Sequence, residues 1–174
     1  MKNNAGFTLI ELLIVIAILA ILAAVVFVSI DPLTRFKDSR DVTRSSDILS
    51  ILDAIKIDQV DNRGPYLSSI SGMNAGQWYM IVDGATMVSG CADNDASCDV
   101  NVSTTTNCVD LSGLVTEGYL GEMPISQSSG LVAWDDGSGV ADEGTGYLLK
   151  RESTGIIRIQ ACESENLDDI KIAR

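Results

Sequence analysis

Glu11 stands at the start of a long apolar stretch, where an acidic side chain is costly. Residues 12–28 include no polar side chain. An ionised carboxylate at the centre of a bilayer costs about 2.5–3.5 kcal/mol on insertion scales, and less near the edge. An acid in such a place is either a functional group that needs a cationic partner or an interfacial residue at the water boundary. Residue type alone leaves both interpretations open.

Other residues that could do chemistry are few. The chain has no histidine, which excludes Ser-His-Asp and Cys-His catalysis and histidine-ligated zinc. An even number of cysteines beyond an apolar segment indicates an oxidising compartment and two disulfides, with free buried thiols as the alternative. These cysteines are Cys91, Cys98, Cys108 and Cys162. Because the chain has no histidine for these catalytic arrangements, we predict that the protein is not an enzyme.

The pairing of the cysteines is not determined by their spacing. Pairing Cys91 with Cys98 would close a small loop, and pairing Cys108 with Cys162 would then tie a short helix to the last strand. Four cysteines allow three connectivities. All three remain open at this point.

The region from Asn62 onward is strongly acidic, with 16 Asp and Glu against 6 Lys and Arg. Such a surface repels phosphates, so we expect no nucleic-acid partner. The oxygen-rich loop 135–143 is a candidate calcium site, and the alternative is a soluble hairpin loop. Its candidate ligands are Asp135, Asp136, Asp142 and Glu143. We predict no cofactor and no metal site other than this candidate.

The element that carries Glu11 is predicted to cross a membrane. Residues 7–30 exceed the roughly 20 residues that span a bilayer. The thirteen Leu, Ile, Val and Phe residues of 12–28 contribute about −4 to −8 kcal/mol on the insertion scale, more than the acid costs. A cleaved signal peptide is the main alternative, but the leader has a single basic side chain, Lys2, and an acid at the start of the run. A core helix would show a polar face.

The run from Gly6 to Leu13, Gly-Phe-Thr-Leu-Ile-Glu-Leu-Leu, resembles the processing motif of type IV pilins and pseudopilins. It combines a short polar leader ending in glycine, a phenylalanine, an acid four residues later and a long apolar helix. Ala5 departs from the pattern, because many relatives carry Lys or Arg there. The resemblance implies cleavage between Gly6 and Phe7 by a prepilin peptidase and N-methylation of the Phe7 amine. It also implies that Glu11 pairs with the Phe7 amine of a neighbouring subunit.

A second helical segment is expected to follow the apolar run. Asp31 before Pro32 is typical of a helix start, and Pro32 predicts a kink if the helix continues. The alternating charges of residues 35–47 indicate a solvated helix surface with local ion pairs, or else pairs between subunits. An apolar stripe then recurs at helical spacing and needs a cover. It consists of Ile48, Ile51, Leu52 and Ile55.

The C-terminal part is expected to supply that cover as a sheet. Strands are predicted at residues 77–82, 131–134, 146–150 and 155–161, the last two as a hairpin. A short helix or turn is predicted over 110–120, capped by Asp110. The fold class is α+β, a long N-terminal helix packed against a small antiparallel sheet.

The predicted domains are a leader (1–6), a transmembrane and filament-core helix (7–30), an amphipathic helix (31–62) and a globular head (63–174). By its resemblance the chain is expected to be a structural subunit of a type IV pilus-like filament, with a type II secretion pseudopilin as the nearest alternative. A membrane-anchored extracytoplasmic binding or enzyme domain is the alternative from another class. The resemblance also implies self-assembly, a prepilin peptidase, an inner-membrane assembly platform and membrane lipid as partners. The precursor is expected in the inner membrane and the assembled form outside the cell or in the periplasm.

Overall fold

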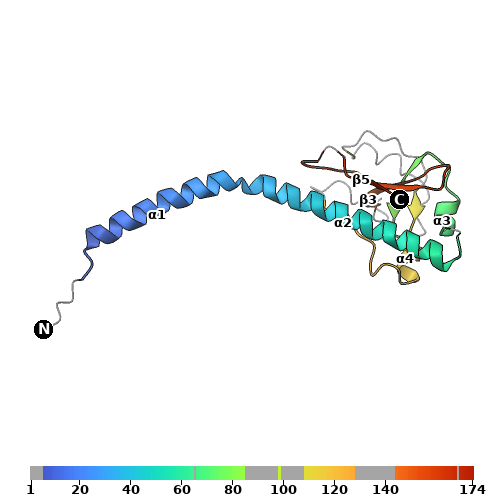
Figure 1. Ribbon diagram of the computed structural model, residues 1–174, viewed down its shortest axis with the longest axis horizontal. Helices are drawn as coiled ribbons and strands as arrows, with labels where there is room; N and C mark the ends of the chain where they lie inside the picture. Colours follow the sequence, from blue (N-terminus) through green and yellow to red (C-terminus); the bar gives the residue numbers. More distant parts are fainter. Residues whose placement is uncertain (1–5, 65, 85–97, 99–107, 128–143, 168) are drawn as a thin grey trace, which may run out of the picture. The chain divides into compact units, whose positions relative to one another are not determined.

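The structure is a computed structural model and describes residues 6–64, 66–84, 98, 108–127, 144–167 and 169–174. The chain divides into two compact units, Met1–Asp38 and Ser39–Arg174. The elements, several of which are labelled in Figure 1, are α1 (Leu9–Ile30), α2 (Pro32–Asp61), α3 (Ser68–Ser71), β1 (Trp78–Val82), β2 (Val109–Asp110), α4 (Ser112–Thr116), β3 (Gly144–Arg151), β4 (Ile157–Ala161) and β5 (Lys171–Ala173). This is the α+β arrangement that the sequence predicts.

The first unit contains α1 and a helix break. None of the residues of α1 is buried. Asp31 ends α1 in the left-handed region, with φ 43° and ψ 75°, and α2 begins at Pro32. The Thr34 hydroxyl donates a hydrogen bond of 2.7 Å to the Asp31 carboxylate. Proline lacks the N–H that would continue the ladder, so the break lies where the sequence predicts a kink.

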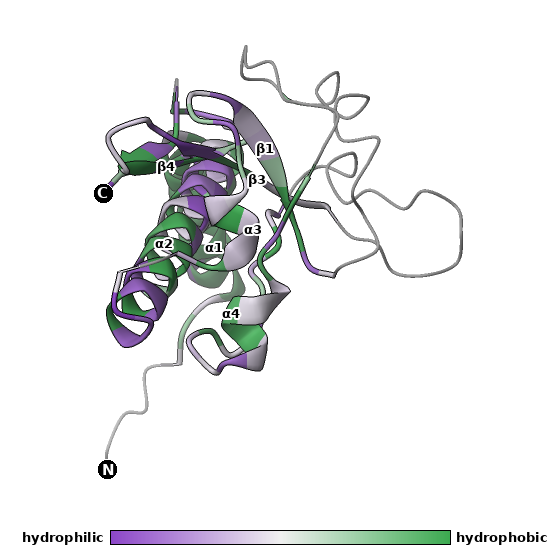
Figure 2. Ribbon diagram, turned by 90° about the vertical axis from the view of Figure 1, so that its right-hand side faces the viewer, coloured by the Kyte–Doolittle hydropathy of each residue, from purple (hydrophilic) through white to green (hydrophobic). Residues whose placement is uncertain are grey.

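In the second unit the apolar stripe of α2 is buried. The side chains of Ile48, Ile51, Leu52 and Ile55 are all 0% exposed. The exposed side of this helix is not wholly polar, because Val42 and Val60 are 67% and 75% exposed; hydrophobic and hydrophilic residues both occur along it in Figure 2. Burying four such side chains contributes roughly 1.5–3 kcal/mol each to the free energy of folding.

The sheet that covers this stripe has five strands in the order β2-β1-β3-β4-β5. The pairs β1–β3, β3–β4 and β4–β5 are antiparallel, whereas β1 and β2 are parallel. The sheet is therefore mixed, and the expectation of a wholly antiparallel sheet is corrected. A parallel pair needs a long connection rather than a tight turn, and β1 and β2 are joined by residues 83–108.

One core joins helix and sheet. Each strand alternates, so that Tyr79 and Ile81 of β1, Tyr147 and Leu149 of β3, and Ile159 of β4 point toward α2 and share its apolar cluster. The opposite face of the sheet carries a smaller cluster built on Met80, Val82, Cys108, Leu148 and Cys162.

Several elements differ from the prediction. The helix expected over 110–120 is shorter, and Asp110 lies in β2. Its carboxylate still accepts a hydrogen bond of 2.9 Å from the Ser112 N–H. The strand expected at 131–134 lies outside the described residues, whereas the strands at 77–82, 146–150 and 155–161 correspond to β1, β3 and β4.

Candidate processing and assembly segment

Gly6 and Phe7 precede α1 in non-helical backbone and are exposed, with Phe7 84% exposed. A Cβ built at Gly6 would meet no heavy atom within 4 Å. Gly6 is also absent from the glycines with positive φ. The fold of this chain therefore does not itself require glycine at position 6.

Glu11 forms a capping box with Thr8 at the start of α1. The Thr8 backbone N–H and hydroxyl donate hydrogen bonds of 2.9 and 2.8 Å to the Glu11 carboxylate. In return the Glu11 N–H donates to the Thr8 hydroxyl at 3.3 Å. The carboxylate thus satisfies one backbone donor, the Thr8 N–H, at the positive end of the helix dipole.

This role of Thr8 is missing from the sequence prediction, although its signal is readable. The pattern Thr8-Leu9-Ile10-Glu11 has the Ser/Thr-x-x-Glu spacing of a capping box just before an apolar run. The resemblance implies a partner for Glu11 on another chain, the Phe7 amine of a neighbouring subunit. Within this chain the Glu11 carboxylate already has a hydrogen-bond partner, Thr8, three residues away. The acid is therefore hydrogen-bonded even in a single subunit.

The apolar character of the segment is unbroken. Among the described residues one helix, Leu9–Asp61 taken across the break at Asp31, is long and apolar enough to cross a membrane by length and composition. The 18-residue stretch of this helix that is apolar enough to span a bilayer contains no buried residue. A helix that is apolar on all sides needs either lipid or other helices around it.

Comparison with known proteins decides what this segment is. The family model described as the prokaryotic N-terminal methylation motif matches residues 1–27. The chain carries the signature of type IV prepilins and pseudopilins. The match ends inside α1, so the methylation motif covers the segment around Gly6, Phe7 and Glu11 and leaves out the second unit. No curated protein matches the chain, and no solved structure matches it.

The methylation motif and the apolar α1 together fit a pilin-like or pseudopilin subunit whose precursor resides in the inner membrane. The signature points to a structural protein of a type that is usually not enzymatic. In general terms, the motif implies processing by a prepilin peptidase and assembly into a filament.

The second unit contains a disulfide between Cys98 and Cys162, with the two Cα atoms 4.7 Å apart. The Cys108 sulfur is disulfide-bonded as well. Both pairings considered from the sequence, Cys91 with Cys98 and Cys108 with Cys162, are therefore corrected, because Cys162, directly after β4, is joined to Cys98. Cys91 lies outside the described residues.

The calcium candidates Asp135, Asp136, Asp142 and Glu143 also lie outside the described residues. In the part of the chain that is described, no group of three or more Cys, Asp or Glu side chains is placed to hold a metal ion. The calcium proposal for that loop therefore stays a prediction.

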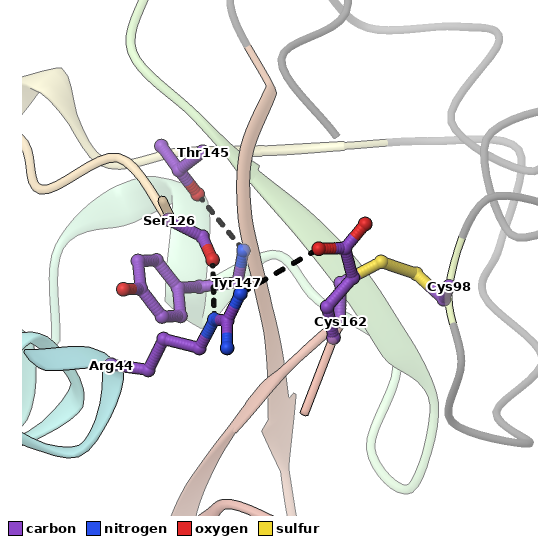
Figure 3. The surroundings of a disulfide bond; sticks show 7 residues. Arg44, Cys98, Ser126, Thr145, Tyr147 and Cys162 are labelled. Atoms are coloured by element: carbon purple, nitrogen blue, oxygen red, sulfur yellow. Dashed lines mark hydrogen bonds and ion pairs between the residues drawn. A yellow bond between two sulfur atoms is a disulfide. The ribbon is translucent and has the colours of Figure 1, made fainter. Parts of the chain in front are cut away.

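A buried charge cluster lies where the sequence suggests a solvated helix surface. Arg44 is 0% exposed and Asp41 is 1% exposed, which corrects that expectation. The Arg44 guanidinium donates to the Asp41 carboxylate at 2.7 Å, to the Gln127 carbonyl at 2.6 Å and to the Ser126 hydroxyl at 3.2 Å. Figure 3 shows the guanidinium pointing toward Ser126, beside Tyr147.

The same cluster holds the segment that follows β4. The Asp41 carboxylate accepts hydrogen bonds from three successive backbone N–H groups, those of residues 165, 166 and 167, at 2.8–3.2 Å. The Glu165 side chain pairs with Arg40 and lies 3.3 Å from Arg44. A buried arginine is tolerable here because its donors meet charged and polar acceptors.

Electrostatics follow from this geometry. Burial acts to raise the pKa of Asp41, but the hydrogen bonds from the 165–167 backbone and from Arg44 outweigh it, so the pKa lies below its ordinary value. The hydrogen bond from Arg40 lowers the pKa of Glu165 in the same way. The cluster is therefore built for ionised carboxylates, and it fastens the C-terminal segment to α2.

Proposed function

We propose that this protein is a structural subunit of a type IV pilus-like extracellular filament. The observation that carries the proposal is the methylation motif at residues 1–27, joined to a wholly exposed apolar helix. Apolar surface of that extent is unstable in water. Lipid can cover it before assembly, and the corresponding helices of other subunits can cover it afterwards.

The first step is processing at Gly6 and Phe7. A prepilin peptidase cleaves the bond between them, which removes the leader 1–6, and the new Phe7 amine is methylated. The open surroundings of Gly6 support this step: since nothing in the fold demands glycine there, the demand comes from the active site of the peptidase.

The second step is assembly through Glu11. Cleavage produces a cationic amine at Phe7, and the Glu11 carboxylate of one subunit pairs with the Phe7 amine of its neighbour in the apolar filament core. A buried carboxylate is tolerable when a cation meets it in the same layer. During this step the Glu11 carboxylate exchanges its hydrogen bonds with Thr8 for an ion pair with the amine. Before assembly the capping box keeps this carboxylate hydrogen-bonded.

The remaining organisation follows. Residues 7–30 form the membrane helix and later the filament core, residues 31–62 lead into the head, and residues 63–174 form the head. The subunit meets an inner-membrane assembly platform, and it needs no cofactor. The acidic composition of the head keeps it soluble outside the membrane.

The proposal is tested by the mass of the mature chain and by electron microscopy of cells. Mass analysis should find a chain that begins at methylated Phe7, and microscopy should find filaments that are missing without this protein. Gly6→Val should leave uncleaved precursor in the membrane, whereas Gly121→Val, at an equally open glycine, should be processed normally. A mature chain that begins near Ala24 would refute the proposal.

Glu11→Ala tests the assembly step separately. We expect this variant to be cleaved and methylated but to give few filaments, and a normal filament yield would remove the role assigned to Glu11. If processing is normal and secretion is lost while wild-type cells show no surface filament, the protein is instead a type II secretion pseudopilin.

A further inference from the structure

A cluster of basic side chains lies on the face of the sheet turned away from α2. Tyr79 and Leu149 point toward α2 and belong to its core. Because successive side chains of a strand point to opposite faces, their neighbours Trp78 and Lys150 lie on the other face. The cluster spans β1, β3, β4 and β5 and consists of Trp78, Lys150, Arg158 and Lys171. We call it the basic face.

The contacts within the basic face concentrate positive charge around one aromatic ring. The Lys150 and Lys171 ammonium groups lie 5.0 and 5.7 Å from the centre of the Trp78 ring. Lys150 and Arg158 are directly opposite each other in the register of β3 and β4. Among the described residues, one carboxylate forms ion pairs with this cluster: Glu152, 3.0 Å from Lys150 and 2.9 Å from Arg158.

This concentration is unexpected in an acidic chain. The sequence holds 24 acids and 12 Lys and Arg, a net charge of −12, yet three cations lie on neighbouring strands and one carboxylate of the described part of the chain pairs with them. Like charges directly opposite on a sheet are destabilising unless an anion compensates them. Glu152 compensates Lys150 and Arg158, whereas none of the described carboxylates forms an ion pair with Lys171. Lys171 is exposed and the Arg158 side chain is 37% exposed, so an external anion can reach both.

The features of the basic face favour a protein as the source of that anion. Arginine is among the residues most enriched at the energetic centres of protein interfaces, and the Arg158 side chain is 37% exposed. A single-stranded nucleic acid would need a free ring face for base stacking, but two ammonium groups lie over the Trp78 ring. The acidic remainder of the head would also repel a chain of phosphates.

We propose that the basic face binds the acidic surface of a second copy of this chain. This inference rests on the proposed function, because a filament brings many acidic heads into contact. An open filament requires a heterologous interface, in which two different surfaces of the same subunit meet. Complementary charge offsets the repulsion between heads and sets their register.

Zero-length cross-linking tests the contact directly. A carbodiimide joins a lysine amine to a carboxylate that touches it, so it should give covalent dimers of the full mature chain in cells. Mass spectrometry of these dimers should find Lys150 or Lys171 joined to an Asp or Glu other than Glu152, which pairs with Lys150 within one chain. The Lys150→Arg/Lys171→Arg variant keeps both charges but has no amine at these positions; it should lose those cross-links and keep normal filaments.

Charge reversal tests whether the contact matters. Lys171→Glu should reduce the yield of sheared filaments by at least about tenfold, with a normal level of processed subunit in the membrane. Arg63→Glu changes the charge equally at an exposed site outside the basic face, and it should have little effect. Equal yields from the two variants would overturn the inference.

The outcomes separate this inference from the proposed function. Filaments without cross-links through Lys150 or Lys171 would overturn the contact and leave the filament function standing. Such cross-links between membrane-held copies, in cells without filaments, would support the contact and count against the filament. Salt-sensitive binding of single-stranded DNA by wild-type filaments, lost in Lys171→Glu, would show that the occupant is a nucleic acid and refute the proposal.

Discussion

Replacing Asp41 with asparagine should destabilise the second unit strongly, although the two side chains have nearly the same size. The Asp41 carboxylate, whose side chain is buried, accepts a hydrogen bond from the buried Arg44 and part-buried hydrogen bonds from three successive backbone N–H groups. Asparagine keeps one of the two acceptor oxygens, loses the charge and turns its own N–H₂ group toward donors. Arg44 then keeps only Glu163 and Glu165 as charged partners.

The expected magnitude follows from the burial of the pair. Removing one partner of a buried ion pair costs about 3–5 kcal/mol when the other charge stays buried without compensation. Because Arg44 keeps two other carboxylates nearby, we expect the lower end of this range, about 3 kcal/mol. For a unit of this size that loss lowers the midpoint of thermal unfolding by about 10 °C or more. Circular dichroism of the detergent-solubilised full chain, heated at neutral pH, measures the midpoint.

Asp38→Asn is the matched control on the same helix. Asp38 lies 3.8 Å from Arg35, and both side chains are largely exposed. An exposed pair of this kind contributes less than about 1 kcal/mol, so the midpoint should move by no more than a few degrees. Equal and small shifts in the two variants would refute the conclusion that Asp41 organises the cluster.

Three further results are expected. Stability should fall on acidification below about pH 4. The pKa values of Asp41 and Glu165 are lowered in the folded state, so these groups stabilise the fold above their unfolded-state pKa values and lose that contribution when they are protonated. Asp41→Asn should flatten this dependence in unfolding measured from pH 7 to pH 3. Ile51→Ala should cost about 2–5 kcal/mol in thermal unfolding, since this side chain is fully buried against the sheet; a loss below 1 kcal/mol would contradict the packing described. Replacing Cys98 and Cys162 together with serine should cost about 4 kcal/mol, as their bond joins positions 64 residues apart; an unchanged midpoint would show that the bond does not constrain the unfolded chain.

Much of the fold could be predicted because its signals are local. The stripe from Ile48 to Ile55 has helical spacing, and a stripe of that kind must be covered. The hairpin of β3 and β4 has alternating residues around a glycine turn, and the motif at Gly6 and Phe7 is a short contiguous pattern. Each of these features can be read within about ten residues of sequence.

The features that could not be predicted depend on distant partners. Arg44 and Asp41 have the pattern of a solvated helix, and their burial depends on residues 163–167, which no local pattern connects to them. β2 has two residues and β5 has three. Strands this short show no recognisable alternation of apolar and polar residues in the sequence. The bond between Cys98 and Cys162 depends likewise on which loop the fold brings to the end of β4.

The fastening of residues 165–167 to Asp41 has a consequence for the order of folding. These partners are 124–126 residues apart in the sequence, so a ribosome completes Asp41 long before it reaches the groups that Asp41 binds. Until then the Asp41 carboxylate lacks these backbone partners, and the apolar stripe of α2 has only the part of its cover that precedes them in the sequence. Contacts of such long range form slowly, and the head reaches its native state after most of the chain has been made. The interval in which this helix is exposed is therefore set by synthesis and export of the chain, and it is the interval in which a chaperone or a protease would meet it.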